Sequence, residues 1–165
     1  MINEYWDVLN RDSEKVGKTI KRGDVLLSGE YHLSVHIWIY DEYGNILIQK
    51  RSKAVEKYPS IWASTGGAAL VNETSIEAAQ REVNEELGLD KGSGNYEYVN
   101  RIVREDSIAD LWKLKINNED IMKIKLNDEV EEVKWVKIEE MSKMLKNKAF
   151  YNYGNEYLKT LKIKI

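Results

Sequence analysis

The sequence predicts an α+β protein in which a mixed β-sheet lies between helices. Segments with strand periodicity occur both before and after one amphipathic helix, and two further helical segments close the chain. A length of 165 residues suits one domain with a sizeable core. We therefore expect residues 1–165 to form a single domain.

The first part of the chain contains short strands separated by polar turns. An N-terminal extension, residues 1–28, holds two of them, joined by a polar turn that predicts a hairpin. The third strand alternates clearly, with Leu33, Val35, Ile37 and Ile39 on one side. The strands expected here are 5–9, 16–20, 31–40, 45–51 and 61–64.

The second part of the chain adds three strands and the closing helices. The polar run at 117–120 is expected to be a turn between strands. The helix expected at 151–161 is only loosely patterned. The strands expected here are 96–103, 108–116 and 132–136, and the helices are 139–145 and 151–161.

The amphipathic helix between these parts has clear start and stop signals. Thr74 and Glu77 form a capping-box pattern, and Gly88 is placed to end the helix in a left-handed conformation. The helix follows Gly66 and Gly67, a pair expected to form a turn. Its buried stripe is predicted to consist of Ile76, Ala79, Val83 and Leu87.

Three glutamates gather near the end of this helix. Glu82, Glu85 and Glu86 stand at positions i, i+3 and i+4, so their side chains project from one face. Like charges at this spacing destabilise a helix by a few tenths of a kcal/mol. The trio therefore needs either full solvation or a cation, and oxygen ligands suit Mg²⁺ or Mn²⁺.

The stretch 67–89 resembles the Nudix hydrolases, whose box is G-x₅-E-x₇-R-E-U-x-E-E-x-G-U, with U a bulky aliphatic residue. Every required position is filled, which makes an accidental match very improbable. The resemblance implies an α/β/α sandwich and Mg²⁺-dependent hydrolysis of a diphosphate linkage, with Mn²⁺ as a substitute. The residues that fill the box are Gly67, Glu73, Arg81, Glu82, Val83, Glu85, Glu86, Gly88 and Leu89.

The resemblance also implies roles for single residues. Glu82 and Glu86 would be the core metal ligands, joined by Glu85 and by the backbone carbonyl of Gly67. These glutamates are also the catalytic candidates, and which of them handles the proton of water differs among family members. The alternative is a solvated acidic helix face. Structural roles in the box fall to Glu73 and Arg81, expected to form an ion pair, and to Gly88.

A further catalytic carboxylate, a ligand or a base, often comes from beyond the box in this family, several residues before a strand tryptophan. Glu129, six positions before Trp135, fits this place best, with Glu131 and Glu132 as rivals.

Candidates for substrate contact lie on the flanking strands. Arg51 could bind phosphate and Trp112 could stack on a base, although strand-end charges are often solvated and tryptophans are often core. His32 could line the site. His32 and His36 share one strand face, but the chain has no third histidine, so a structural role is the competing interpretation.

The upstream flank resembles the Nudix subgroup related to isopentenyl-diphosphate isomerase. Glu30-Tyr31-His32, the run 44–52 and Trp62 carry this likeness. That isomerase requires a cysteine before the box glycine and a histidine after it. Gly66 and Ala68 occupy those places, which excludes isomerase chemistry by those residues and leaves hydrolysis untouched.

Composition narrows the possible functions. The net charge of −3 shows no basic surface for nucleic acid, and the absence of cysteine excludes disulfides and thiol catalysis. No apolar run approaches the roughly 18 residues of a membrane span, and the first residues do not resemble a signal peptide. We expect a cytoplasmic protein, either a monomer or a homodimer.

The expected substrate is a nucleoside diphosphate linked to another group X. Family markers for ADP-ribose, dinucleoside polyphosphates and coenzyme A are not matched; no proline follows Pro59, for example, and Glu105 stands near the place of an expected tyrosine. One alternative is a non-catalytic module that senses a nucleotide or binds a protein, although such modules tend to lose box carboxylates. Trimming of RNA is disfavoured by the acidic charge balance.

Overall fold

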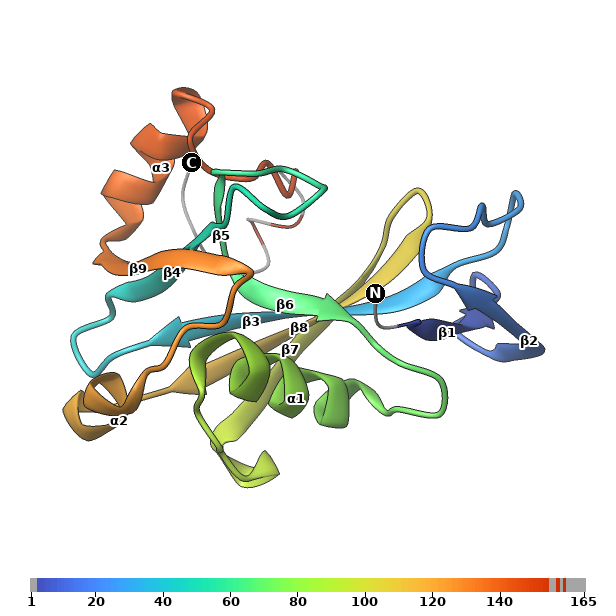
Figure 1. Ribbon diagram of the computed structural model, residues 1–165, viewed down its shortest axis with the longest axis horizontal. Helices are drawn as coiled ribbons and strands as arrows, with labels where there is room; N and C mark the ends of the chain where they lie inside the picture. Colours follow the sequence, from blue (N-terminus) through green and yellow to red (C-terminus); the bar gives the residue numbers. More distant parts are fainter. Residues whose placement is uncertain (1–2, 155–156, 158, 160–165) are drawn as a thin grey trace.

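The computed structural model describes residues 3–154, 157 and 159, which contain two β-sheets and three α-helices (Figure 1). The expected N-terminal hairpin is present: β1 (Tyr5–Leu9) pairs antiparallel with β2 (Lys15–Lys21). A bridge between Leu9 and Tyr31 attaches this hairpin to the start of the main sheet. Most expected elements appear with their ends shifted by one or two residues.

The main sheet has seven strands, five of them in the order β5-β4-β3-β8-β7. β3 and β8 run parallel and the other pairs are antiparallel, so the predicted mixed sheet is confirmed. β6 pairs with β3, and β9 pairs with β4. The bounds are β3 (His32–Tyr40), β4 (Ile46–Arg51), β5 (Trp62–Ala63), β6 (Thr65–Ala68), β7 (Tyr96–Val103), β8 (Ser107–Lys115) and β9 (Val130–Val136).

Strands β3 and β4 separate soon after their shared turn. They pair only at Ile39–Leu47 and Tyr40–Ile46. Farther along, β3 takes β6 as its neighbour, whereas β4 takes β5. The short β6 therefore stands where the two halves of the sheet diverge, directly before the loop that leads into the first helix.

Helices cover both faces of the sheet, as the α/β/α prediction requires (Figure 1). The helix α1 (Ser75–Leu87) buries Ala79, Val83 and Leu87 against the face that carries Val35. The helix α3 (Ile138–Lys146) packs on the opposite face, where its Met141 is fully buried. Because neighbouring residues of a strand point to opposite faces, β3 contributes to both cores.

The polar run at 117–120 is not a turn, which corrects the expectation from the sequence. It opens the helix α2 (Asn118–Lys123). Asn117 Oδ1 accepts a hydrogen bond from the backbone N–H of Asp120 at 3.0 Å, and the Asp120 carboxylate accepts one from the backbone N–H of Asn117 at 3.1 Å. The same short polar side chains that favour turns also cap helix N-termini, and here the capping role prevails.

The glycine pair before the box does not form a turn either. Gly66 and Gly67 lie within β6, paired with His36 and Val35 of β3. A Cβ on Gly66 would collide with the carbonyl oxygen of Val35, so this glycine permits close approach of two backbones.

The last expected helix is not seen at its predicted start. Residues 151–154 are not helical, and most of the remaining stretch lies outside the described residues. None of the helices in the described ranges is both long and apolar enough to cross a bilayer.

Candidate active site

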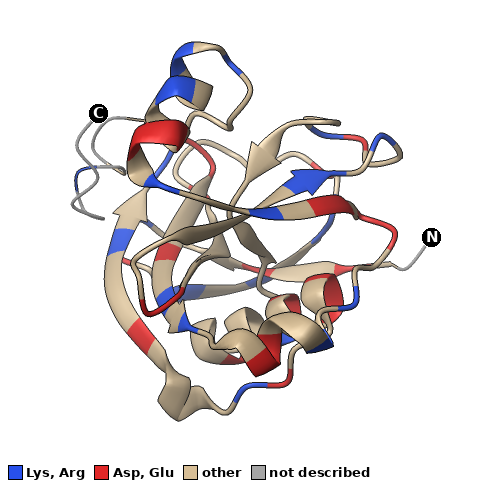
Figure 2. Cartoon of the chain, turned by 90° about the vertical axis from the view of Figure 1, so that its left-hand side faces the viewer, with Lys and Arg blue, Asp and Glu red and all other residues tan. Residues whose placement is uncertain are grey.

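The box helix is held at both ends by the local signals seen in the sequence. Glu77 N–H donates to Thr74 Oγ1, and the Glu77 carboxylate accepts from the Thr74 N–H at 2.8 Å. At the other end Gly88 adopts a φ of 67°, the left-handed conformation that terminates a helix. These caps hold the last turns of α1, with their glutamates, beside β6. Figure 2 shows acidic positions in red along this helix.

Arg81 connects the loop, the strand and the acidic turns. Its Nε and Nη2 donate to the carboxylate of Glu73 at 2.8 and 3.0 Å, so the expected ion pair is present. Nη2 also reaches the carbonyl of Ala68 at 2.9 Å. Nη1 contacts Glu82 at 2.8 Å and Glu85 at 3.0 Å. One guanidinium thus braces the box and partly neutralises two of its glutamates.

Glu82 lies against the backbone of Gly67. A Cβ on Gly67 would collide with the carboxylate oxygens of Glu82, so only glycine leaves that carboxylate its place. The Glu82 side chain is largely buried, whereas the Glu85 side chain is 54% exposed. The structure therefore brings Gly67 and Glu82 together and leaves Glu85 at the rim.

Glu86 is the most enclosed of the three glutamates, with 3% of its surface exposed. Its Oε2 accepts hydrogen bonds from Gln49 Nε2 at 2.8 Å and from the Gly66 N–H at 3.2 Å. Sequence reasoning missed Gln49. The only available signal was an amide within the apolar strand of residues 46–51, and no spacing rule connects that strand with the box.

Burial makes both inner carboxylates reluctant to ionise. Burial raises the pKa of Glu86 to about 8, the nearby Glu82 charge adds to the rise, and Gln49 and Gly66 oppose it. Burial likewise raises the pKa of Glu82 to about 7, against the lowering effect of Arg81. Two acidic groups held together in a desolvated place favour either a proton or a cation between them.

Glu129 belongs to the same electrostatic cluster. It precedes β9, and its backbone carbonyl accepts from the Ser52 N–H at 2.8 Å. Its charge raises the pKa of both Glu82 and Glu86. Its rival Glu131 is paired with Lys50 at 2.9 Å. Glu132, the other rival, lies opposite Lys50 on β9 and is exposed.

The oxygen atoms of these glutamates are the type of ligand that a divalent metal ion such as Mg²⁺ prefers. The Glu82 and Glu86 carboxylates lie where β6 meets the end of α1. Within the described part of the chain, however, no three acidic or histidine side chains already stand in metal-binding geometry. One oxygen of Glu82 and one of Glu85 contact the Arg81 guanidinium instead.

The candidates for substrate contact have other partners in this structure. His32 stacks on Trp6 with ring centroids 4.3 Å apart. Trp112 donates from Nε1 to Ser75 Oγ at 2.9 Å. Arg51 donates from Nε to the Lys57 carbonyl at 3.0 Å. None of these partners is a box glutamate.

His36 lies apart from the box carboxylates, in the core on the α3 side. It is partly buried, and its Nδ1 shares a hydrogen bond of 2.7 Å with Tyr157 Oη. Burial lowers the pKa of His36 to about 3, which keeps the ring neutral near pH 7. This arrangement supports a structural role for His36 over a place in a histidine metal pair.

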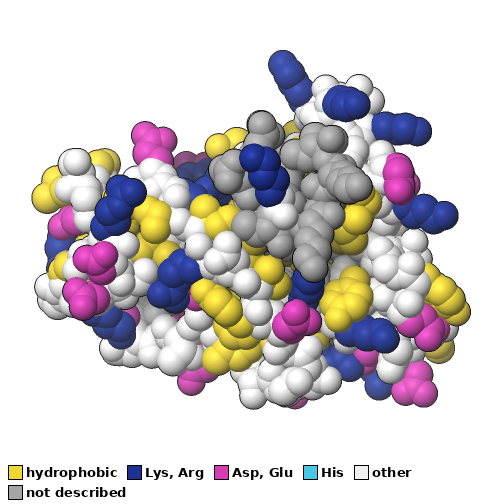
Figure 3. All heavy atoms as spheres, turned by 180° about the vertical axis from the view of Figure 1, so that it is seen from behind, with side chains coloured by type: hydrophobic (Ala, Val, Ile, Leu, Met, Phe, Trp, Pro, Cys, Tyr) yellow, Lys and Arg dark blue, Asp and Glu magenta, His cyan; other side chains and the backbone are white. Residues whose placement is uncertain are grey.

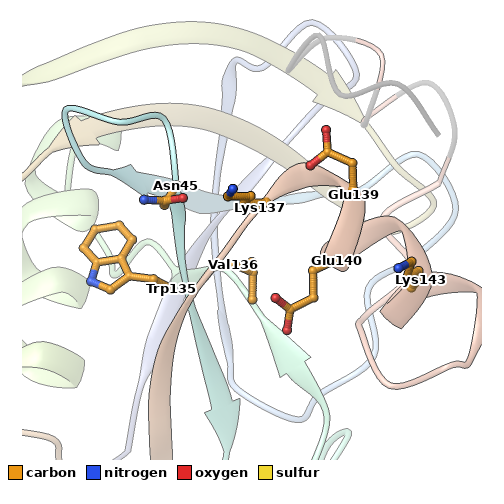
Figure 4. A pocket seen from close by; sticks show the side chains of 7 residues that line it. All are labelled: Asn45, Trp135, Val136, Lys137, Glu139, Glu140 and Lys143. Atoms are coloured by element: carbon orange, nitrogen blue, oxygen red, sulfur yellow. The ribbon is translucent and has the colours of Figure 1, made fainter.

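Two surface hollows lie away from the box. The larger, of about 510 Å³, opens between the end of β9 and the start of α3, where Trp135 and Glu140 line it (Figure 4). The second, of about 390 Å³, lies between the turn after β3 and the start of α2. Neither hollow is lined by a box residue, so the candidate site coincides with neither of them. The larger hollow is lined by Asn45, Trp135, Val136, Lys137, Glu139, Glu140 and Lys143.

Known proteins share both the sequence signature and the fold. The family model described as NUDIX domain matches residues 30–155. An uncharacterised Nudix hydrolase of Listeria monocytogenes is 52% identical over 87 residues, 52% of this chain and 52% of that protein. The matched stretch thus spans about half the length of that relative.

Two solved structures show the same fold at low sequence identity. A protein from Deinococcus radiodurans superposes with a TM-score of 0.79 at 20% identity, covering 98% of this chain and 100% of that one. An Ap4A hydrolase of C. elegans gives a TM-score of 0.57 at 20% identity, covering 79% and 95%.

The fold and the site together define an α/β/α protein whose box helix presents buried carboxylates beside a glycine strand. The chain belongs to the NUDIX family. Members of this family generally depend on divalent metal ions.

Proposed function

We propose that this chain is a Mg²⁺-dependent hydrolase of a diphosphate linkage, acting on a nucleoside diphosphate joined to another group X. The observation that supports it most is the pair of buried, mutually repelling carboxylates Glu82 and Glu86, held beside Gly67 in a complete box. The Ap4A hydrolase among the structural neighbours is named for a nucleotide substrate.

In this proposal the cation is held by Glu82, Glu85, Glu86 and the carbonyl oxygen of Gly67. Mg²⁺, or Mn²⁺ in its place, would neutralise phosphate charge and lower the pKa of a bound water. Glu82 and Glu85 would turn an oxygen from Arg81 toward the cation. Arg81 would meanwhile keep its bonds to Glu73 and to the Ala68 carbonyl, so the frame of the site stays in place.

Handling of the water proton falls to the glutamates around the cation. Glu129 is our candidate for a further ligand or base, because its charge acts on both inner carboxylates. Arg51 remains the candidate for substrate phosphate, and His32 and Trp112 remain candidates for substrate contact. For these last two the proposal requires a substrate that extends well beyond the diphosphate.

The distribution of charged side chains on the surface supports a small-molecule substrate. On the face shown in Figure 3, basic side chains are scattered among acidic and apolar ones rather than gathered in a stripe. Nucleic acid is therefore a poor substrate in this proposal. A single domain over residues 1–165, a cytoplasmic location and the isomerase-related subgroup also remain parts of it, with a monomer and a homodimer both compatible.

A substrate panel with Mg²⁺ tests the proposal. Nucleotide sugars, nucleoside di- and triphosphates and other diphosphates are incubated with the wild type, with Glu86→Gln and with the matched control Glu131→Gln. We expect the wild type and the control to release phosphate or nucleoside monophosphate, and Glu86→Gln to do so far more slowly. If no variant turns over any compound while all bind nucleotide equally, a non-catalytic sensor is the better description.

A further inference from the structure

A chain of buried polar groups leads from the sheet to Glu86. Gln49 on β4 donates from Nε2 to Glu86 Oε2 at 2.8 Å, and Thr65 on β6 donates from Oγ1 to Gln49 Oε1 at 2.9 Å. Gln49 and Thr65 are each 2% exposed and Glu86 is 3% exposed. Three elements, β4, β6 and α1, thus meet in one network without access to bulk water.

The chemistry of the groups determines the direction of each bond. A carboxylate that holds a cation is ionised and only accepts hydrogen bonds, so with a cation present Gln49 must turn its amide NH₂ toward Glu86. Its carbonyl oxygen then faces Thr65, whose hydroxyl must donate. Glu86 thus disfavours a flipped amide, which would place two acceptors face to face, and Thr65 anchors the other end of the amide by donating to its carbonyl oxygen.

The network also distinguishes the two oxygens of the Glu86 carboxylate. Oε2 accepts from Gln49 and from the Gly66 N–H, whereas none of the hydrogen bonds found among residues 3–154, 157 and 159 reaches Oε1. Gln49 itself is held firmly, since it pairs with Ala63 of β5 and with Val133 of β9. One carboxylate oxygen is thus fixed to the sheet and the other is left free.

We infer that Gln49, oriented by Thr65, is a positioning residue that holds Glu86 with Oε1 free for the cation. The inference rests on the proposed function. Repulsion from Glu82 would drive an untethered Glu86 carboxylate away, and a cation would then have to bring it back. With the tether in place the ligand is oriented before the cation arrives, as hydrogen-bonded partners of ligands do at other metal sites.

A purely structural network makes a different prediction. Buried amides and hydroxyls need partners in any protein, and their loss lowers stability wherever they lie. If that were the whole role of Gln49, removing it would lower the melting temperature without changing the metal affinity of the folded molecules. Metal affinity and stability must therefore be measured side by side.

The decisive measurement is Mn²⁺ binding without substrate, followed by electron paramagnetic resonance of free Mn²⁺. Gln49→Met keeps the shape of the side chain and removes its donor, and we expect affinity to fall about 10- to 100-fold. Thr65→Val keeps the shape and removes the donor that anchors the Gln49 carbonyl oxygen, so we expect a smaller fall. Thr65→Ser keeps the hydroxyl and should restore affinity close to that of the wild type.

Ser64→Ala is the matched control. Ser64 neighbours Thr65 in the chain and is also buried, but its hydroxyl bonds Tyr153 Oη at 2.8 Å in the core on the α3 side. We expect it to lower stability and leave Mn²⁺ affinity unchanged. If Gln49→Met does not fold, the contrast between Thr65→Val and Thr65→Ser decides the question.

The outcomes distinguish the positioning role of Gln49 from the proposed function of the protein. A wild type that binds Mn²⁺ and cleaves a diphosphate, with Gln49→Met or Thr65→Val binding equally well, overturns the positioning role alone. Loss of affinity in Ser64→Ala as large as in Gln49→Met overturns it too. A wild type that neither binds Mn²⁺ nor cleaves any diphosphate overturns the proposed function, and the positioning role with it.

Discussion

The two faces of the main sheet both bury ionisable groups, but with opposite consequences. On the α3 side His36 is neutral, and Tyr157 also accepts from Trp38 Nε1 at 3.0 Å. Tyr157 thereby satisfies both of these side chains. On the α1 side burial raises the pKa of both Glu82 and Glu86, and nearby carboxylate charges add to each rise. Satisfied neutral groups stabilise a core, whereas unsatisfied like charges mark a place prepared for a ligand.

The largest expected effect concerns the least exposed carboxylate. Glu86→Gln should lower kcat about 10³-fold, because an amide cannot supply the negative charge that the site uses. The metal-free protein should not lose stability, since one of two repelling charges is gone. Initial rates with the best substrate and urea denaturation in EDTA measure the two quantities. A variant that is inactive because it is unfolded would contradict this account of the α1 side.

The two glycines of β6 should respond very differently to the same substitution. Gly66→Ala sets a methyl group against the Val35 carbonyl at a φ of 153°, and we expect a loss of about 3 kcal/mol or more in unfolding free energy. Gly67→Ala meets only the mobile end of Glu82, so its loss should be about 1 kcal/mol.

Their Mn²⁺ affinities complete the comparison. Gly67→Ala should bind Mn²⁺ more weakly than wild type although it is nearly as stable, because the Glu82 carboxylate has moved. Urea denaturation and Mn²⁺ titration of both variants provide the test. Equal losses of unfolding free energy at Gly66 and Gly67 would show that the close approach of Gly66 to the Val35 carbonyl is not what makes alanine costly in β6.

The stability of the metal-free protein should depend on pH in opposite senses on the two faces. The folded pKa of Glu86 is raised to about 8 and that of Glu82 to about 7, so the folded protein holds protons that the unfolded chain releases. Their stability contribution is fully present below the unfolded pKa of 4.5 and is lost as pH rises toward 8. The lowered pKa of His36 works the other way, and its effect is complete above pH 6.5.

The window from pH 6.5 to 8 therefore isolates the carboxylates. We expect the unfolding free energy in EDTA to fall by about 2 kcal/mol across it, and most of this fall to disappear in Glu86→Gln. Added Mg²⁺ should reduce the fall, because the cation stabilises the charged form. Urea denaturation at three pH values measures it, and a flat profile for the wild type would contradict the uncompensated charge.

The smallest expected effect is at α2, which supplies neither His36 nor the inner carboxylates and therefore serves as a control. Asn117→Ala removes the N-cap of α2, and we expect a loss of about 1 kcal/mol in unfolding free energy. Mn²⁺ affinity should stay at the wild-type value, since α2 supplies none of the proposed ligands. Thermal denaturation and a Mn²⁺ titration check this prediction. Weaker Mn²⁺ binding here would mean that general destabilisation alone can disturb the site.

Features that depend on residues close together in the chain were the easiest to predict from the sequence. Thr74, Glu77 and Gly88 signal the ends of α1 because capping involves residues within one turn of each other. Asn117 and Asp120 carried the same kind of signal, yet short polar residues suit turns and caps alike, so it was misread. A turn at Gly66 is the wrong expectation because the Val35 carbonyl that Gly66 approaches lies far away in the chain, and no local pattern reveals that contact.

The sequence by itself determined the mixed sheet, the N-terminal hairpin, the box helix and the family, because these depend on periodicity, capping and a motif of fixed spacing. Only the tertiary structure decided that Glu86 is buried, that Arg81 turns Glu82 and Glu85 toward itself, and that Gln49 and Thr65 reach Glu86. Desolvation and hydrogen bonding between strand and helix arise when distant segments pack together, and the order of residues along the chain does not encode such contacts locally.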